Sequence, residues 1–369
     1  MSNFITKILR ISEQYSFIKP IIKEDRVVSF EYGPLGELLC QNITNEWNIS
    51  NMIVRDNPAF AFYRSVDSGN FFESIKTPFM EARRITQNSL PFSITCSRIP
   101  KAHSEYTETL AKESTYFRSS KTTELKNITF TAPEEGRQFF HFWQRQRKIW
   151  WRKFSADPGR FFLSEIKNDG DIEYTDIQAK FEWGVESIER IRVLPESSFK
   201  HLPVEDQEEW MIKVKKKKIL PNVIESVTNL DCAAFCFLCD AFIEETRLDT
   251  NKLRQFMKFH RKLAPYKAAF VIDTSGTSHR EDLKLLAEYL ALNIKKVGIS
   301  VLYVPLLCTN PVEEMIEYYD LLGIPFVVVL KPSTLADGIF GLRSRETTLQ
   351  ELLNINQLTE HLQILLKNY

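Results

Sequence analysis

Three apolar runs alternate with two helix-like segments over the last hundred residues, and this pattern constrains the fold more than any other feature of the chain. The runs are APYKAAFVID, ISVLYVPL and IPFVVVLK, and the segments between them are HREDLKLLAEYLALNIKKVG and PVEEMIEYYDLLG. Continuous apolar runs are typical of strands buried on both faces, and their alternation with helices indicates an α/β unit. We therefore predict a separate α/β domain over residues 263–369, with helical segments again from Leu349.

The preceding residues mix helix and strand patterns without this regular alternation. The spacing of apolar residues predicts strands at PFSITCSRI, NITFTAP and SNMIVRD, and helices at Ile5–Tyr15, Leu35–Trp47 and Cys232–Thr246. A chain of 369 residues is too long for one ordinary core. We therefore predict an α+β protein, with a core domain over residues 1–247 and a linker or helix over 248–262.

The composition excludes several classes of protein. With 43% hydrophobic and 26% charged residues, the chain is typical of a globular protein rather than a disordered one. No apolar run reaches the roughly 20 residues of a membrane span, so no membrane contact is expected. Glycine is scarce, at 12 residues, and no Gly-rich loop for a nucleotide phosphate is present, so no cofactor is expected. The net charge is zero, and any nucleic-acid contact must therefore come from local basic patches.

Cys232, Cys236 and Cys239 cluster at helical spacing among Ala, Phe and Leu residues. Zinc would need a fourth ligand and usually a turn between its ligands. A buried helix that packs small side chains is therefore favoured over a metal site. The six histidines are scattered, and the sequence contains neither an HExxH pattern nor an evident paired-carboxylate site. We predict no catalytic residues and no metal.

Two basic segments are candidates for contact with DNA. In Phe139–Phe154, a period of 100° per residue places aromatic residues on one face and three cations on the opposite face. In MIKVKKKKILP, a run of lysines follows a predicted strand. Both segments have simpler explanations, as a core helix with a solvated basic side and as a strand edge that lysines protect from pairing. The candidate phosphate-contacting residues are Arg145, Lys148, Arg152, Lys215, Lys216, Lys217 and Lys218.

The N-terminal segment MSNFITKILRI is basic before its first acidic residue and has apolar residues at helical spacing. It has two interpretations, a short mitochondrial presequence or the first helix of the fold.

Two parts of the chain resemble glycyl-type class II aminoacyl-tRNA synthetases. FEYGPLGELLCQNITNEW is similar to their first class-defining region. LAPYKAAFVI, GISVLYV, IPFVVVL and LADGIFGLRSRETT are similar to their anticodon-binding domain. The resemblance implies a core domain of antiparallel sheet with helices, followed by an anticodon-binding-like domain with a mixed sheet.

The residues that such a synthetase needs for catalysis do not match. Where the second motif would read Phe-Arg-x-Glu, this chain reads CSRIPKAH, in which Arg98 is followed by Pro100 and Lys101 without a glutamate in register. The nearest counterpart of the third motif, WGVESIERI, has Gly184 and Arg190 at a different spacing. Loss of an arginine that offsets phosphate charge would remove several kcal/mol of transition-state stabilisation. The core is therefore expected to be a degenerate, non-catalytic one.

A more specific resemblance fits a non-catalytic core. FWQRQRKIWWRKF, LAPYKAAF and LRSRETTLQELLNINQL together resemble the accessory subunits of mitochondrial DNA polymerase gamma, and the resemblance covers most of the chain. It implies a processivity factor in the nucleoid of the mitochondrial matrix. It also implies two partners, the catalytic subunit, bound largely through the C-terminal domain, and double-stranded or primer-template DNA.

Carried over by position, the C-terminal segment that matches this family contains Gly338, Leu342, Arg343 and Arg345. We predict that this region forms or supports the surface for the catalytic subunit. The alternative is that Arg343 and Arg345 only pair with Glu346 or Glu351.

One departure from the family concerns the oligomeric state. Vertebrate members insert a long helical hairpin and dimerise through it, whereas residues 57–88 here are short and contain Pro58 and Pro78. The expectation is a monomer that forms a one-to-one complex with the polymerase. Two other functions stay open: an active glycyl- or prolyl-type synthetase, and a stand-alone tRNA-binding protein.

Overall fold

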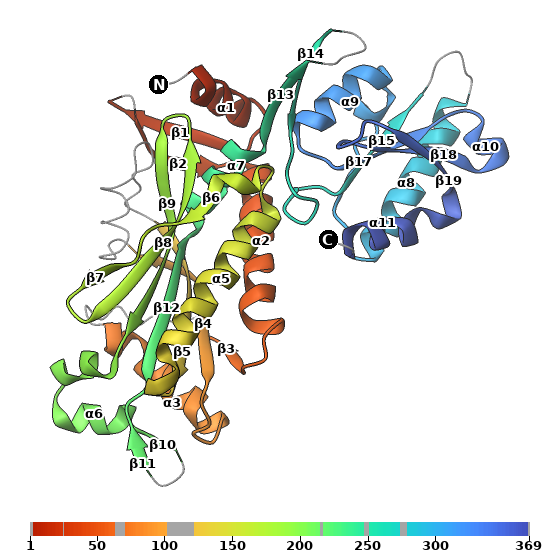
Figure 1. Cartoon of the computed structure of the whole chain (residues 1–369). Helices are drawn as coiled ribbons and strands as arrows, with labels where there is room; N and C mark the ends of the chain where they lie inside the picture. The colour runs from red at the N-terminus through yellow and green to blue at the C-terminus, as the bar shows by residue number, and fades with distance from the viewer. Residues whose placement is uncertain are drawn as a thin grey trace.

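The computed structural model describes residues 3–24, 26–62, 71–101, 122–214, 217–246, 251–273 and 279–367. Figure 1 shows a larger N-terminal part built around a long sheet and a smaller C-terminal part with its own sheet and helices. The predicted α+β class is confirmed.

An eight-stranded sheet forms the centre of the N-terminal part. Its strands lie in the order β3-β4-β5-β12-β9-β8-β6, and β7 also pairs with β8. The β3–β4 pair is parallel and the other pairs are antiparallel. The strands are β3 (Ala59–Ala61), β4 (Phe92–Lys101), β5 (Thr122–Thr131), β6 (Phe161–Leu163), β7 (Lys167–Asp169), β8 (Ile172–Phe181), β9 (Gly184–Leu194) and β12 (Asn222–Asn229).

Helices cover this sheet, and two small hairpins extend from it. In Figure 1, α5 lies along the sheet with α2 beside it, and α3 and α6 lie at the far end of the sheet from the C-terminal part. The helices are α1 (Asn3–Gln14), α2 (Pro34–Asn48), α3 (Phe71–Ile85), α5 (Gly136–Phe154), α6 (Val204–Trp210) and α7 (Leu230–Ala241). The hairpins are β1 (Ile18–Lys23) with β2 (Arg26–Tyr32), and β10 (Ile212–Val214) with β11 (Lys217–Ile219).

The C-terminal part is built on a five-stranded mixed sheet in the order β16-β15-β17-β18-β19. The pairs of β15 with β16 and with β17 are parallel, and the pairs of β18 with β17 and with β19 are antiparallel. Its elements are β15 (Ala268–Ile272), α8 (Arg280–Lys296), β16 (Val301–Leu302), α9 (Val312–Leu321), β17 (Phe326–Leu330), α10 (Thr334–Asp337), β18 (Ile339–Ser344), β19 (Gln350–Asn354) and α11 (Leu358–Lys367).

Both faces of this sheet are buried, as its continuous apolar runs predict. Ala268 and Phe270 of β15 pack in a cluster with Leu283 of α8, whereas Ala269 of the same strand packs in the large cluster that contains Met315 of α9. Alternate residues of a strand point to opposite faces, so helices lie on both sides of the sheet. The large cluster also contains residues of the N-terminal sheet and helices, so the two parts share one continuous core.

The segment between the two parts differs from the prediction. The helix expected over Cys232–Thr246 ends at Ala241, and β13 (Phe242–Thr246) pairs in antiparallel fashion with β14 (Leu253–Met257). A strand therefore lies where residues 248–262 were expected to form a linker or helix, and the helical interpretation of that range is wrong. Phe242, Phe256 and Met257 are buried, so burial of apolar side chains fixes this hairpin.

Two further expectations are wrong. The strand expected at SNMIVRD is a π-helical extension of α2 over Ile49–Ile53, in which the Asn51 side-chain amide donates to the carbonyl of Trp47 at 2.7 Å. The helical region expected from Leu349 starts with the edge strand β19.

The N-terminal segment forms α1, the first helix of the fold. Ile5, Ile8 and Ile11 are buried, and Lys7 pairs with Glu244 of β13 at 2.9 Å. This packing supports the second of the two interpretations of MSNFITKILRI. Among the described residues, no helix is both long and apolar enough to cross a bilayer.

Candidate nucleic-acid and partner interface

Helix α5 presents the basic face that the sequence predicts. Trp143, Trp150 and Phe154 are buried, whereas Arg145 is exposed and Lys148 is half-buried. Arg152 is also half-buried, and its Nε donates to the carbonyl of Phe161 at 2.9 Å. Arg145 and Lys148 are therefore the two cations of this face best placed to meet a phosphate.

A buried charge on the inner face of α5 was missed by the sequence analysis. Arg147 is fully buried, and its Nε donates to Glu189 Oε1 of β9 at 2.6 Å. Trp151 Nε1 donates to the other oxygen of Glu189 at 2.6 Å, and the hydroxyl of Ser226 also donates to this carboxylate. The sequence does contain a signal for the burial of Arg147, because helical spacing puts this residue between Trp143 and Trp150 on the apolar face. This pair fixes α5 to the sheet.

The lysine run lies on the β10–β11 hairpin. Lys213, Lys217 and Lys218 are exposed, and Lys213 lies opposite Lys218 across the hairpin. Lys215 and Lys216 lie outside the described residues. The helix that precedes the hairpin, α6, is acidic, with Glu205, Asp206, Glu208 and Glu209.

The basic face of α5 runs from the middle of the helix to its C-terminal end, whereas the lysine hairpin lies near the N-terminal end. Gly136, where α5 begins, lies against Asn222, close to the hairpin in sequence, whereas Phe154, where α5 ends, contacts the ring of His260 at 4.9 Å. Figure 1 shows the hairpin at the end of the core that is remote from the C-terminal part. At 1.5 Å per residue, Arg145 lies about 14 Å and Arg152 about 24 Å along α5 from Gly136, so the structure does not join the two patches.

The C-terminal candidate residues have structural roles inside the molecule. Gly338 is the left-handed C-cap of α10, with φ +69°, a conformation that favours glycine. Leu342 is 3% exposed and belongs to the buried cluster that also contains residues of α8 and α11. Arg343 donates to both oxygens of Asp320, at 2.9 and 3.0 Å.

Arg345 is also fully buried. Its Nη1 donates to the carbonyl of Gly323 and its Nη2 to that of Phe259, each at 2.6 Å, and burial lowers its pKa to about 10. The alternative pairing with Glu346 is a longer contact of 3.9 Å. Since Leu342, Arg343 and Arg345 are buried in this chain, they can support a partner surface but do not themselves form one.

The sheet face that carries Arg190 is occupied by internal ion pairs. Arg190 of β9, the candidate third-motif arginine, donates to both oxygens of Asp176 on β8, at 2.8 and 3.0 Å. Its guanidinium also lies 4.5 Å from the ring of Tyr174. On β5, which β12 separates from β9, Lys126 pairs with Glu124 at 3.0 Å. An arginine held in this bidentate way must first break its pair with Asp176 before it can bind a phosphate.

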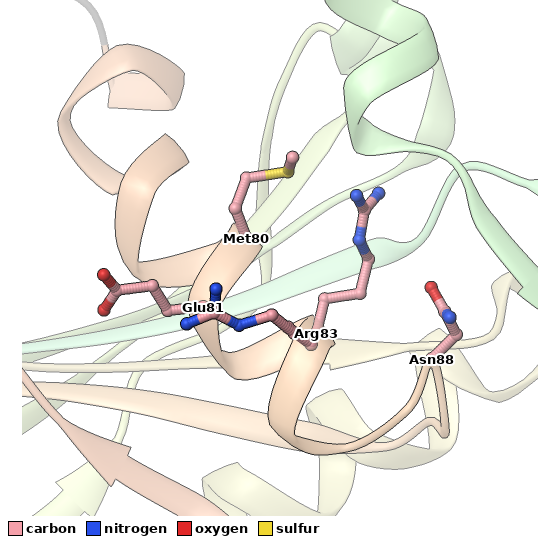
Figure 2. A pocket seen from close by; sticks show the side chains of 5 residues that line it. Met80, Glu81, Arg83 and Asn88 are labelled. Atoms are coloured by element: carbon pink, nitrogen blue, oxygen red, sulfur yellow. The ribbon is translucent and has the colours of Figure 1, made fainter.

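A surface hollow of about 380 Å³ lies on α3. Figure 2 shows its lining side chains, including Met80, Glu81, Arg83 and Asn88. Arg83 Nη1 donates to the carbonyls of Glu209 and Met211, at 2.7 and 3.0 Å. These bonds connect α3 to the last turn of α6 and to the residue after it. Arg83 therefore has a structural role.

The cysteines of α7 pack as the sequence predicts. Cys232, Cys236 and Cys239 are buried, and burial raises the pKa of each thiol well above its usual value. Thiols of this kind are unreactive side chains of a helix core. Over the described parts of the chain, no group of three or more His, Cys, Asp or Glu residues is arranged to hold a metal ion.

Comparison with known proteins gives one match confined to the C-terminal part and others that cover most of the chain. Residues 269–365 match the family model of the anticodon binding domain. Over 290 residues, 77% of its length, the chain is 26% identical to "DNA polymerase subunit gamma-2, mitochondrial" of Xenopus laevis, of which it covers 61%. Over 245 residues, 65% of its length, it is 28% identical to "DNA polymerase subunit gamma-2" of Bos taurus, of which it covers 50%.

This chain is similar to DNA polymerase subunit gamma-2. It spans 61% and 50% of the length of these two relatives. It is also 24% identical, over 317 residues, to the glycine–tRNA ligase of Mycoplasma capricolum, with coverage of 84% of this chain and 65% of the ligase. The similarity to a polymerase subunit and to a synthetase agrees with both resemblances that the sequence motifs carry.

Proposed function

We propose that this protein is a non-catalytic accessory subunit of a mitochondrial DNA polymerase. In this role it binds the catalytic subunit and primer-template DNA, and it raises processivity in the nucleoid of the mitochondrial matrix. The similarity to DNA polymerase subunit gamma-2 supports the polymerase assignment. The single structural observation that supports a non-catalytic role is the bidentate pair of Arg190 with Asp176, which holds the candidate ATP-binding arginine within the sheet.

The mechanism we propose is slower dissociation of the polymerase from DNA. Added protein–protein contact and weak electrostatic contact with DNA lower the off-rate of the complex without changing phosphoryl transfer. The gain is largest at salt concentrations that remove the catalytic subunit alone from its template.

Primer extension on a long single-stranded template tests this function. The catalytic subunit, with this protein added at raised salt, is expected to give products several-fold longer per binding event than the catalytic subunit alone. Unchanged product length with folded protein would contradict the proposal. ATP–pyrophosphate exchange with glycine or proline is the parallel assay, and activity there would support the synthetase instead.

DNA contact is assigned to α5 rather than to the hairpin, because the hairpin adjoins the acidic helix α6. The double variant Arg145→Glu/Lys148→Glu is expected to weaken binding to duplex DNA at least about tenfold. It should also lower the slope of log K against log salt by about 2, since each phosphate contact contributes roughly 0.9. The matched variant Lys217→Glu/Lys218→Glu removes the same charge from the hairpin. If the hairpin variant alone loses binding, the assignment to α5 is wrong.

A stand-alone tRNA-binding protein is the second candidate, because residues 269–365 match the anticodon binding domain. Competition between tRNA and duplex DNA of equal length distinguishes this candidate from the polymerase subunit, and preference for tRNA would favour the tRNA-binding protein.

We further propose a monomer that binds one catalytic subunit. Light scattering is expected to give the 43.1 kDa of one chain, and a salt-resistant homodimer would contradict this.

A further inference from the structure

Helices α2 and α5 bury a group of side-chain nitrogens that have no hydrogen-bond partner among the described residues. They are Trp47 Nε1, Arg55 Nε, Trp143 Nε1, Gln144 Nε2, Arg147 Nη1 and Arg147 Nη2. Trp47 and Arg147 are fully buried, and Trp143 is 3% exposed. Buried polar groups in folded proteins are nearly always paired, because an unpaired one loses its bonds to water without replacement. We call these six nitrogens the α2–α5 donor cluster.

Two contacts show how α2 and its extension pass α5. Trp150 Nε1 of α5 donates to the carbonyl of Glu46 on α2 at 3.3 Å. Further along, the guanidinium of Arg55 lies 4.6 Å from the ring centre of Trp143. The chain therefore advances along α2 while it recedes along α5, so the two segments run antiparallel. Residues 47–54 lie between these contacts on one side, and residues 144–149 lie between them on the other.

Arg147 lies in the middle of this contact. It is one helical turn from both Trp143 and Trp150, and its guanidinium lies 4.5 Å from the ring centre of Trp150. Its Nε donates to Glu189 Oε1 at 2.6 Å, which leaves Nη1 and Nη2 unpaired in the described part of the chain. Burial, followed by the charge of Arg147, lowers the pKa of Arg55 to about 10. The two guanidinium groups therefore lie within range of each other's charge.

Positive charge exceeds negative charge in the α2–α5 donor cluster. Arg55 and Arg147 carry two positive charges, and Glu189 offsets one of them. Asp56 is exposed, and its charge raises the pKa of Arg55 less than the charge of Arg147 lowers it. Arg55 is itself half-buried, so it connects the cluster with solvent. Excess positive charge that is largely removed from water is stabilised by a bound anion.

The donors also outnumber the unpaired acceptors beside them. Asn51 Oδ1 is one such acceptor, and Asn127 Oδ1 is another, on a strand position that pairs with Ser226 next to Glu189. A buried water molecule that accepts from two of the nitrogens has two hydrogens of its own to donate. An anion accepts several N–H bonds and donates none. Six nitrogens against two oxygens therefore favour an anion over water.

We propose that the α2–α5 donor cluster binds a small monovalent inorganic anion between Arg55 and Arg147. The anion accepts from both guanidinium groups and from the indole N–H groups of Trp47 and Trp143, so it joins α2 to α5. Both tryptophans belong to the large buried cluster, so a bulky organic anion does not fit between them. The site is independent of the proposed function, because Arg147 lies on the inner face of α5 and the candidate phosphate contacts lie on the outer face.

Thermal unfolding in sodium chloride and in sodium gluconate at equal ionic strength tests the proposal. An anion present at about tenfold above its dissociation constant is expected to raise the Tm of a chain of this length by about 2 °C. The parent chain should show this increase in chloride. Trp143→Phe keeps an aromatic ring but removes the indole N–H, and Arg55→Gln removes one charge. Each of these variants should lose at least about half of the increase.

Arg137→Gln is the matched control, because it removes an exposed cation from α5 and should keep the increase of the parent chain. Each protein is compared with itself in the two salts, so the cost of a substitution to stability does not enter. Crystals grown in sodium bromide give a second readout, in which an anomalous peak is expected beside Arg147 Nη1 and Nη2.

Three results would overturn the anion site. An equal increase in the parent chain and in both cluster variants would show a general effect of salt. Absence of any increase in the parent chain would show that chloride does not bind. A network of water without bromide at the cluster would show water as the occupant. None of these measurements involves DNA or a polymerase, so the proposed function stands or falls separately.

Discussion

Replacing Asp320 by Asn is expected to lower the free energy of unfolding by about 3–5 kcal/mol. The carboxylate is 1% exposed and accepts from Arg343 at 2.9 and 3.0 Å and from Arg254 Nη2 at 2.8 Å. Asparagine nearly preserves the volume but removes the charge that compensates two buried guanidinium groups. Removal of one partner from a buried ion pair typically costs this much, because the remaining charge stays out of water without compensation.

Urea unfolding of the parent chain and of Asp320→Asn measures this difference. The control is Glu314→Gln, which removes an exposed carboxylate from the same helix α9 and should change stability by less than about 0.5 kcal/mol. Because Arg254 lies on β14 and Arg343 on β18, the loss should also speed amide hydrogen exchange in both strands. An Asp320→Asn protein within 1 kcal/mol of the parent would show that the three groups do not act as a buried network.

The elements that the sequence predicts well are those whose apolar period is unambiguous. The aromatic helix around Trp143 and Trp150, the cysteine helix α7 and the buried strands β15 and β17 follow directly from burial of a periodic face. The mixed sheet followed from the resemblance of the C-terminal segments to an anticodon-binding domain, and the family match to residues 269–365 agrees with it.

The elements that were missed depend on pairing with another strand or on a local side-chain bond, and neither leaves an apolar period in the sequence. β13 has no strand signal of its own, because Phe242 continues the apolar run of α7, and only pairing with β14 makes it a strand. The π-helical turn after α2 reflects the local bond of Asn51 to the carbonyl of Trp47 rather than any period.

The exposure of some candidate site residues can be predicted from a local period, whereas the burial of others depends on residues elsewhere in the chain. Exposure of Arg145 follows from the helical period alone. Burial of Arg343 and Arg345 requires Asp320 and the carbonyls of Gly323 and Phe259, which no local pattern connects to them. The sequence analysis missed the outward apolar side chains of α8, Leu285, Tyr289 and Leu292, for a related reason. A helix with apolar residues on both faces looks, in sequence, like one that is buried all round.

Acidification from pH 7 to pH 4 is expected to cost this protein about 3 kcal/mol of stability through His260 alone. Burial, followed by the charges of Lys153, Lys262, Arg261 and Lys267, lowers the pKa of this imidazole from 6.5 to about 4. Its Nδ1 also accepts from the backbone N–H of Lys262 at 3.2 Å, a bond that requires an unprotonated nitrogen. Between pH 6.5 and 4 the unfolded chain binds a proton that the folded chain does not bind. Stability from this residue is therefore complete above pH 6.5 and falls as the pH drops toward 4, by about 1.4 kcal/mol per pH unit.

His260→Asn isolates this contribution, because asparagine keeps an acceptor near Nδ1 but does not titrate. Burial raises the pKa of other groups, such as the Asp231 and Asp240 carboxyls, so the informative quantity is the difference between the two proteins at each pH. Unfolding free energies measured from pH 4 to pH 7 should show a shallower slope for His260→Asn. The exposed residue His141 on α5 provides the control, and His141→Asn should follow the parent curve. Parallel curves for His260→Asn and the parent would mean that the fold accepts a charged imidazole at this position, and that the four neighbouring cations are screened by solvent.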